Sequence, residues 1–342
     1  MSVKQTSQKL TIADIARMAN VSKATVSYVI NNKKGVSLDV RKKIKQIIKE
    51  SNYKPNTMAR ALAGKRTNSV GLIIPDISDM FYANIIRGVE KASGKFGYFL
   101  NLFTTHADPE KEHEVFDFFT SSMADGVIVM TYFVGKEVTK KLKQRKIPCV
   151  FLDFPYDNYI YSVSVDNFEG GYKATNYLIS LGHKKIAFIL GPEAARDSKA
   201  RYHGYLRALE EHNIHFDKDF VLKGDFLTKS GYKAAKRLLE TQKIPTALFA
   251  ANDQMALGAM SAFKKEGYRI PEDISIIGFD NTEASSFSRP ALTTIMQPIF
   301  EMGSLAAKTL ISLINGKTPG KKRYLLETRL IERQSCGYCN KR

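Results

Sequence analysis

Polar and aromatic side chains follow the ends of several predicted strands along this chain. A carboxylate accepts hydrogen bonds from two hydroxyl groups, an arginine donates a forked pair, and an aromatic ring stacks on the apolar face of a sugar. In a two-lobed α/β protein such strand ends converge on one crevice, where small ligands bind. We therefore expect a saccharide site, with a purine as the alternative. The candidate residues are Phe81, Tyr82, Asp166, Arg201, Phe226, Asn252 and Asp280.

A second kind of chemistry is indicated by the charge of the first 66 residues. This stretch holds 15 Lys and Arg against three acidic residues, Asp14, Asp39 and Glu50, so its net charge is +12 of the chain's +18. The other 276 residues share only +6. Positive charge concentrated in a short terminal segment predicts a nucleic-acid-binding module joined to a nearly neutral body.

Motifs of enzymes and of metal sites are missing from the sequence. The stretch Gly316-Lys317-Thr318 has Ile311 where a phosphate loop needs glycine, and it is expected to follow a helix rather than a strand. Neither a G-x-S-x-G nor an H-E-x-x-H motif occurs. We therefore predict no catalytic residue, metal or cofactor. The six histidines are expected on the surface or in loops, and the tail around Cys336 and Cys339 is expected to be frayed and reduced. No apolar run suits a membrane span or a signal peptide, which favours a cytoplasmic location.

The hydrophobic periodicity near the amino terminus predicts two short helices joined by a tight turn. Thr11 is the expected cap of the first helix, Asn20-Val21 interrupts the pattern, and Ser22 caps the second helix. This is the pattern of a helix-turn-helix. A third helix over 38–51 can close a three-helix core.

The stretch 53–64 opens with a proline and ends on glycine, and we interpret it as a linker that is helical only when supported. From Ser69 on, apolar runs alternate with helical patterns, and the series occurs twice with a pause near 156–165. This favours two doubly wound lobes with parallel sheets. Asp253 is expected to cap a helix that begins at Gln254. The expected strands are 69–75, 98–103, 126–131, 148–153, 185–191, 246–250 and 274–279, and the expected helices are 81–96, 169–181, 201–211, 231–239 and 253–267.

Four motifs resemble the lactose repressor/galactose repressor family of bacterial regulators across essentially the whole chain. They are TIADIARMANVSKATVSYVIN at 11–31, YKPNTMARALAGKRTNSVGLIIPDI at 53–77, ALFAANDQMALGAM at 247–260 and DISIIGFDNTEASSFSRPALTTI at 273–295. The resemblance implies a helix-turn-helix headpiece over 1–54, a hinge helix over 55–66 and a periplasmic-binding-protein-like core over 67–342. Its lobes are expected to be joined by crossings near 156–165 and 290–298.

The resemblance also implies a repressor that binds a palindromic operator as a homodimer and responds to an effector. A tetramer is disfavoured because no apolar heptad repeat follows Arg333. The family's ligand positions fall on the crevice residues named above. Its purine binders carry more basic groups near position 195, which here is Ala195, so a sugar is favoured. The alternatives are an architectural DNA binder without effector and an enzyme fused to a DNA-binding head.

The DNA-contacting positions of the family fall mainly on the second helix. Lys23, Ala24 and Tyr28 match its base-reading positions, where a lysine donates to guanine and an alanine touches a thymine methyl. Tyr28 departs from the arginine common in the family, so the base it faces is expected to differ. Thr25, Ser27 and Asn31 suit phosphate oxygens. Thr11, Ser22, Asn56, Ala61 and Leu62 complete the expected DNA-contacting set, with Leu62 as a minor-groove wedge beside small neighbours.

Overall fold

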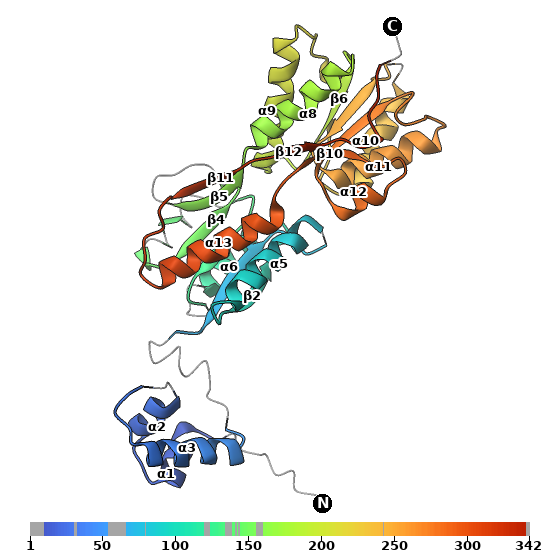
Figure 1. Cartoon of the computed structure of the whole chain (residues 1–342). Coiled ribbons are helices and arrows are strands. Elements are labelled where there is room, and N and C mark those ends of the chain that lie inside the picture. The colour runs from blue at the N-terminus through green and yellow to red at the C-terminus, as the bar shows by residue number, and fades with distance from the viewer. Residues whose placement is uncertain are drawn as a thin grey trace, which may run out of the picture. The chain divides into compact units, whose positions relative to one another are not determined.

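A computed structural model describes residues 10–30, 33–53, 66–78, 80–119, 124–133, 139–140, 142, 144–154, 160–241 and 243–339. The chain divides into two compact units, Met1–Thr67 and Asn68–Arg342 (Figure 1). Each unit is described by itself below. The expected hinge helix, with Asn56, Ala61 and Leu62, lies outside the described residues, and so does Asn31.

The first unit contains the three predicted helices, α1 (Ile12–Ala19), α2 (Lys23–Ile30) and α3 (Leu38–Glu50). Thr11 caps α1 in a capping box with Asp14, and Asn20 ends the helix in the left-handed conformation with a φ of 55°. Ser22 Oγ accepts a hydrogen bond from Thr25 N at 3.1 Å, which starts α2. The predicted helix-turn-helix is confirmed. Its core consists of Ile15, Ala16, Ala19, Val26, Val29 and Ile44.

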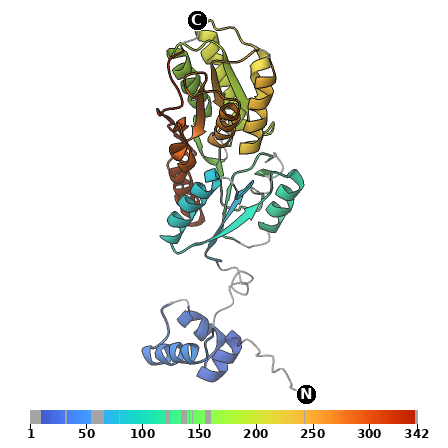
Figure 2. The same cartoon turned by 90° about the vertical axis from the view of Figure 1, so that its right-hand side faces the viewer.

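The second unit contains two lobes, each built on a six-stranded sheet (Figure 2). The first sheet has the order β11-β5-β4-β3-β1-β2, and all its pairings are parallel. Helices α5 (Met80–Gly94), α6 (Pro109–Phe119) and α13 (Ile299–Ile314) belong to this lobe. Its strands are β1 (Ser69–Ile74), β2 (Phe99–Thr104), β3 (Val127–Val129), β4 (Cys149–Leu152), β5 (Tyr161–Val165) and β11 (Arg323–Leu326).

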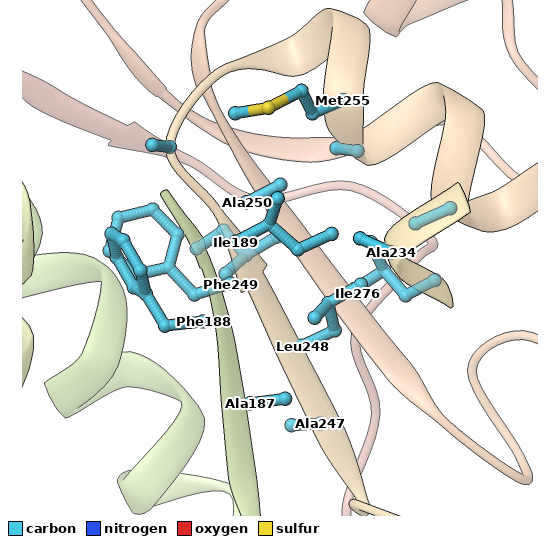
Figure 3. Packing of buried hydrophobic residues seen from close by; sticks show 14 of the residues in the cluster. Ala187, Phe188, Ile189, Ala234, Ala247, Leu248, Phe249, Ala250, Met255 and Ile276 are labelled. Atoms are coloured by element: carbon cyan, nitrogen blue, oxygen red, sulfur yellow. The ribbon is translucent and has the colours of Figure 1, made fainter. Parts of the chain in front are cut away.

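The second sheet has the order β12-β10-β9-β8-β6-β7, with β12 antiparallel to β10 and the other pairings parallel. Aliphatic and aromatic side chains of its central strands pack with those of the helices that cover it (Figure 3). Its strands are β6 (Ile186–Leu190), β7 (Val221–Lys223), β8 (Ala247–Ala250), β9 (Ser275–Asp280), β10 (Thr293–Met296) and β12 (Arg329–Ile331). Its helices are α8 (Asn167–Ser180), α9 (Arg196–Glu211), the short 3-10 helix η1 (Lys218–Phe220), α10 (Thr228–Glu240), α11 (Asp253–Lys265) and α12 (Glu283–Phe287).

The chain passes between the lobes at Asp166, at 297–298 and at 327–328. The stretch 327–328 was not among the expected crossings. The stretch 156–165, expected to be a break in the series of strands and helices, ends in strand β5. This strand is buried between β4 and β11, but its alternating Ser and Val residues do not form the continuous apolar run that marks a buried strand. Helix α13 is the helix expected before Gly316. Elements α6, α12, β7, β10, β11 and β12 were not among the expected helices and strands.

Three helix pairs pack with one glycine on each helix at the contact. A Cβ atom on Gly88 of α5 would lie 2.2 Å from the carbonyl oxygen of Phe300 in α13, and one on Gly303 would lie 2.4 Å from the oxygen of Ile85. The missing side chains let the backbones approach closely. The same reciprocal arrangement joins α8 to α9 through Gly171 and Gly204, and α10 to α11 through Gly231 and Gly258.

The carboxyl-terminal tail and His183 differ from expectation. The tail is ordered through Cys339, whose N–H donates to the carbonyl oxygen of Leu181 at 2.8 Å. His183 lies in a loop, as expected, but it is buried, and its ring nitrogens lie 3.0 Å from Thr246 Oγ1 and from Ser275 Oγ. The carbonyl oxygen of Gly337 also lies 3.0 Å from its Nε2. The expectation of a frayed tail was wrong, because these buried polar groups hold it to β9.

Candidate functional site

A pocket in the second unit is lined by residues of both lobes. Its walls come from the carboxyl ends of parallel strands, where ligands bind in open α/β sheets. The first lobe contributes Phe81, Tyr82, Met130, Thr131, Tyr132, Leu152 and Asp153. The second lobe contributes Arg196, Asp197, Arg201, Phe226, Asn252 and Asp280. Six of the seven crevice residues expected from the sequence therefore lie around one pocket.

Asp166 is the expected residue that the pocket lining does not include. Its Oδ1 accepts a hydrogen bond from Glu169 N at 2.9 Å, so the carboxylate caps α8. Asp166 follows the lobe crossing, as expected, and β5, a strand that was not expected, precedes it. Its side chain is used for the helix terminus.

Arg201 is held almost entirely inside the protein, with 2% of its surface exposed. Its Nε donates to Asn167 Oδ1 at 2.9 Å, and NH1 donates to the carbonyl oxygen of Ala251 at 2.5 Å. NH2 lies 3.3 Å from Asp197 Oδ2, and the guanidinium carbon lies 3.9 Å from the Phe279 ring centroid. These contacts fix the charge of Arg201 at the pocket wall. The expected start of this helix at Arg201 was one turn late, since α9 begins at Arg196.

Asn252 and Phe226 are positioned by one another. Asn252 Oδ1 accepts from Met255 N at 2.9 Å and caps α11, while its Nδ2 donates to the carbonyl oxygen of Phe226 at 2.9 Å. The expected capping by Asp253 was wrong. Asp253 is buried in the first turn of the helix, where its carboxylate accepts hydrogen bonds from Thr282 and from Thr294.

Asp280 ends β9 and presents its carboxylate to the pocket. Its Oδ1 accepts from Gln297 Nε2 at 2.6 Å and lies 3.9 Å from Arg201 NH1. The φ of Asp280 is 119°, that of Phe226 is 71° and that of Asp153 is 46°. Non-glycine residues with such positive φ values are uncommon, and strained backbone concentrates at ligand sites.

Two pocket carboxylates, Asp153 and Asp197, were missed in the sequence. Asp153 follows β4, so the rule that selected Asp280 could have found it, whereas Asp197 was hidden by the late helix start. Asp153 Oδ1 accepts from Val165 N at 3.3 Å, and its buried Oδ2 has no hydrogen-bond partner among the described residues. Burial, reinforced by repulsion from Asp197 and opposed by Arg201, raises the pKa of Asp153 to about 7.

The outward face of α2 carries the residues expected to read DNA. Lys23, Ala24 and Tyr28 are exposed, whereas Val26 and Val29 are buried. The ammonium of Lys33 lies 5.7 Å from the centroid of the Tyr28 ring. Ser22 and Thr25 bond to each other through their hydroxyl oxygens at 2.9 Å, and Ser27 is half-buried. Thr11 lies at the start of α1, with its hydroxyl donating to Asp14.

Metal and membrane sites have no support among the described residues. No group of three His, Cys, Asp or Glu side chains is placed to hold a metal ion. Within the same residues, none of the helices combines the length and apolarity that crossing a membrane requires.

A helix-turn-helix unit joined to a two-lobed core with a pocket between the lobes defines a ligand-responsive type of DNA-binding regulator. Comparisons with known proteins agree with this class. Residues 11–56 match the family described as bacterial regulatory proteins, lacI family, and residues 175–336 match the periplasmic binding protein-like domain. The catabolite control protein A of Priestia megaterium is 37% identical over 328 residues, which cover 95% of this chain and 99% of that protein. The chain belongs to the LacI family of bacterial transcriptional regulators.

Solved structures show the same relationship. The lac repressor dimer bound to operator and the anti-inducer ONPF superposes with a TM-score of 0.86 at 29% identity, covering 96% of this chain and 99% of that one. The transcriptional regulator CelR in complex with cellobiose gives a TM-score of 0.74 at 31% identity, covering 95% and 99% of the two chains. The fold predicted from the sequence, a helix-turn-helix headpiece with a periplasmic-binding-protein-like core, is thus confirmed.

Proposed function

We propose that this regulator is a repressor that binds a two-fold symmetric operator as a homodimer in the cytoplasm, and that a saccharide in the inter-lobe pocket controls its affinity for DNA. The proposed parts are a headpiece over 1–54, a hinge helix over 55–66 and an effector-binding core over 67–342. The pocket between the lobes supports this proposal most directly. A ligand that touches both lobes favours one arrangement of the lobes over others by its differential affinity.

The chemistry of the pocket favours a polyhydroxylated ligand. Three carboxylates, Asp153, Asp197 and Asp280, can accept hydrogen bonds from hydroxyl groups, and the Phe226 ring offers an apolar face. The structural relative CelR is bound to a disaccharide, cellobiose. Three carboxylates against two arginines give little attraction for an anionic ligand. A purine corepressor is the second candidate, because the rings of Tyr82, Tyr132 and Phe226 could also stack on a planar base.

We further propose that the core binds its effector without chemical conversion. Its relatives are transcriptional regulators, and Arg201 and Asp253 are engaged in structural hydrogen bonds. Incubation with the bound saccharide should return it unchanged, and appearance of a product would contradict the proposal.

For DNA recognition we propose that Lys23, Ala24 and Tyr28 face base edges, while Thr25, Ser27 and Asn31 lie at phosphates with Thr11, Ser22 and Asn56. Leu62, flanked by Ala61, is proposed as a wedge in the minor groove. Exposure of Lys23 and Tyr28 on one helix supports the base-reading assignment.

The direct test is a thermal-shift screen of the full-length protein with sugars, phosphosugars and purines. A ligand that binds only the native state raises the melting temperature by mass action. We expect a neutral saccharide to raise it and to change operator affinity in a gel-shift titration. Stabilisation by purines alone would identify a purine, not a saccharide, as the effector. A ligand that raises the melting temperature but leaves operator affinity unchanged would contradict effector control.

A further inference from the structure

The loops at the amino edge of the first lobe's sheet are strongly basic. All six strands of this sheet are parallel, so the loops that lead into them share one edge. Backbone hydrogen bonds from Phe99 N to Asn68 O and from Ser162 N to Lys322 O join these two loop residues to the neighbouring strands β2 and β5. Within the described parts of these loops, Asp125 is the one acidic residue. The basic residues of these loops, together with Arg323 at the start of β11, are called the basic edge here. They are Lys95, Arg145, Lys146, Lys317, Lys321, Lys322 and Arg323, and all are exposed.

The opposite edge of the same sheet has the opposite charge. The described stretches that follow its strands, 75–78, 105–108, 130–133, 153–154, 166 and 327–328, contain no Lys or Arg. Their acidic residues are Asp76, Asp108, Asp153, Asp166 and Glu327. The first lobe is therefore polarised along its strands, and its positive end is not a consequence of a uniformly basic surface.

The basic edge is also where the second unit is joined to the DNA-binding unit. Asn68 immediately precedes β1, so the chain from the helix-turn-helix enters the lobe at this edge (Figure 1). Fifteen residue steps separate Tyr53 from Asn68, and a fully extended chain of that length spans at most about 54 Å. The length of the chain therefore limits how far Asn68, at one point of the basic edge, can lie from Tyr53.

The dimensions of the edge suit a duplex. Five steps between adjacent strands of about 4.8 Å each make the edge about 24 Å long. This length exceeds the width of a major groove, about 12 Å, so a duplex along the edge presents phosphates of both groove walls to it. Lys321 and Lys322 lie at the β11 end of the edge, and Lys95 lies at the β2 end.

We propose that the basic edge of the core binds phosphates of the operator duplex beside the bases that the helix-turn-helix reads. This contact adds affinity that does not depend on base sequence, since lysines that neutralise phosphates release counterions whatever the bases are. The proposal goes beyond effector control and depends only on the family's DNA binding. The core thereby acts as a second DNA-binding surface in addition to its sensing role.

The test compares the full-length protein with the triple variant Lys317→Gln, Lys321→Gln, Lys322→Gln. The matched control is Lys199→Gln, Lys229→Gln, Lys265→Gln, which removes three exposed lysines from the second lobe. The probes are an operator duplex selected from random sequences by the full-length protein and a random duplex of equal length. Affinity is measured between about 50 and 200 mM salt, the range over which phosphate contacts change affinity strongly.

We expect the slope of log affinity against log salt to become shallower by about 0.9 for each lost phosphate contact. The change should occur for both duplexes in the basic-edge variant, with the selected base sequence unaltered, and not in the control. Equal slopes for the basic-edge variant and the control would overturn the proposal, since they would reflect net charge alone. Unchanged operator binding with lost repression in cells would instead assign the surface to a protein partner and also overturn it. Circular dichroism of both variants checks that they fold.

Discussion

At the scale of single residues, the proposed effector contact of Asp280 can be tested separately from DNA binding. Its carboxylate bonds Gln297 and lies near Arg201, whereas Arg201 itself holds Asn167 and Ala251 in place, so its truncation would also disturb the fold. We expect Asp280→Asn to weaken effector binding at least about tenfold, since a lost buried partner typically costs about 1 to 3 kcal/mol. Calorimetric titration measures the change.

Operator affinity without effector should stay unchanged in Asp280→Asn. Glu240→Gln, at the exposed end of α10, is the matched control and should behave as the parent. Unchanged effector affinity in Asp280→Asn would place the ligand elsewhere.

Asp153 should make the stability of the protein depend on pH. Burial and the Asp197 carboxylate raise its pKa to about 7, above the value of an unfolded chain. The protonated form is favoured in the native state, so this contribution to stability is complete below about pH 4 and is lost as pH rises through about 7. The Asp153→Asn variant has no ionisable carboxyl at this position, so it does not lose this stability as pH rises. The melting temperature of the variant relative to the parent should therefore rise between about pH 5 and pH 8, as differential scanning calorimetry can measure. A difference independent of pH would contradict the assignment.

In the first unit, Lys23 is the exposed side chain best suited to choose a base, because it lies in the first turn of α2. A lysine bonded to guanine contributes about 1 to 3 kcal/mol of discrimination. Lys23→Ala should therefore change the base preference at one position of each half-site in a binding selection. A uniform loss of affinity across all sequences would make Lys23 a phosphate contact instead.

At the scale of helices and strands, the reciprocal glycines determine how closely helices pack. Gly88→Ala would push its Cβ against the Phe300 carbonyl of α13, and overpacking of this kind costs about 1 to 3 kcal/mol. Gly94 ends the same helix with no atom near the position of a Cβ, and its φ lies outside the positive range. Gly94→Ala should be neutral or stabilising by up to about 1 kcal/mol. Urea denaturation of the two variants makes the comparison, and equal effects would refute this account of the packing.

Much of this architecture could be predicted from the sequence, for reasons that differ between elements. Strands such as β1 and β8 were found because continuous apolar runs bounded by polar residues mark burial on both faces. Strand β11, exposed in part at a sheet edge, and β12, three residues long, carry too little periodicity to be detected. Six pocket residues were predicted because they follow strands or match the family. Asp197 was missed because the first turn of α9, Arg-Asp-Ser-Lys, has no apolar pattern.

At the scale of the whole molecule, edge strand β2 presents an exposed apolar surface that fits the proposed homodimer. Phe99, the first residue of β2, is 79% exposed, and Phe96, three residues before it, is exposed as well. An uncovered edge with large apolar groups is a liability that proteins normally bury or charge. Phe99→Ser should shift the dimer towards monomer in analytical ultracentrifugation and weaken operator binding. Tyr338→Ser removes an equally exposed ring from the tail and serves as the control. A dimer unaffected by Phe99→Ser would move the interface elsewhere.

The interleaving of the two lobes has a consequence for how the chain folds as the ribosome makes it. The first sheet contains β11, which follows β10 of the second sheet in the sequence, and α13 returns to the first lobe after most of the second has been made. Helix α13 therefore cannot pack on α5, and the first lobe stays incomplete, until translation has passed residue 314. The three-helix first unit has its own core and no such dependence. A nascent chain can therefore contain a folded helix-turn-helix unit while its effector-binding core is still incomplete.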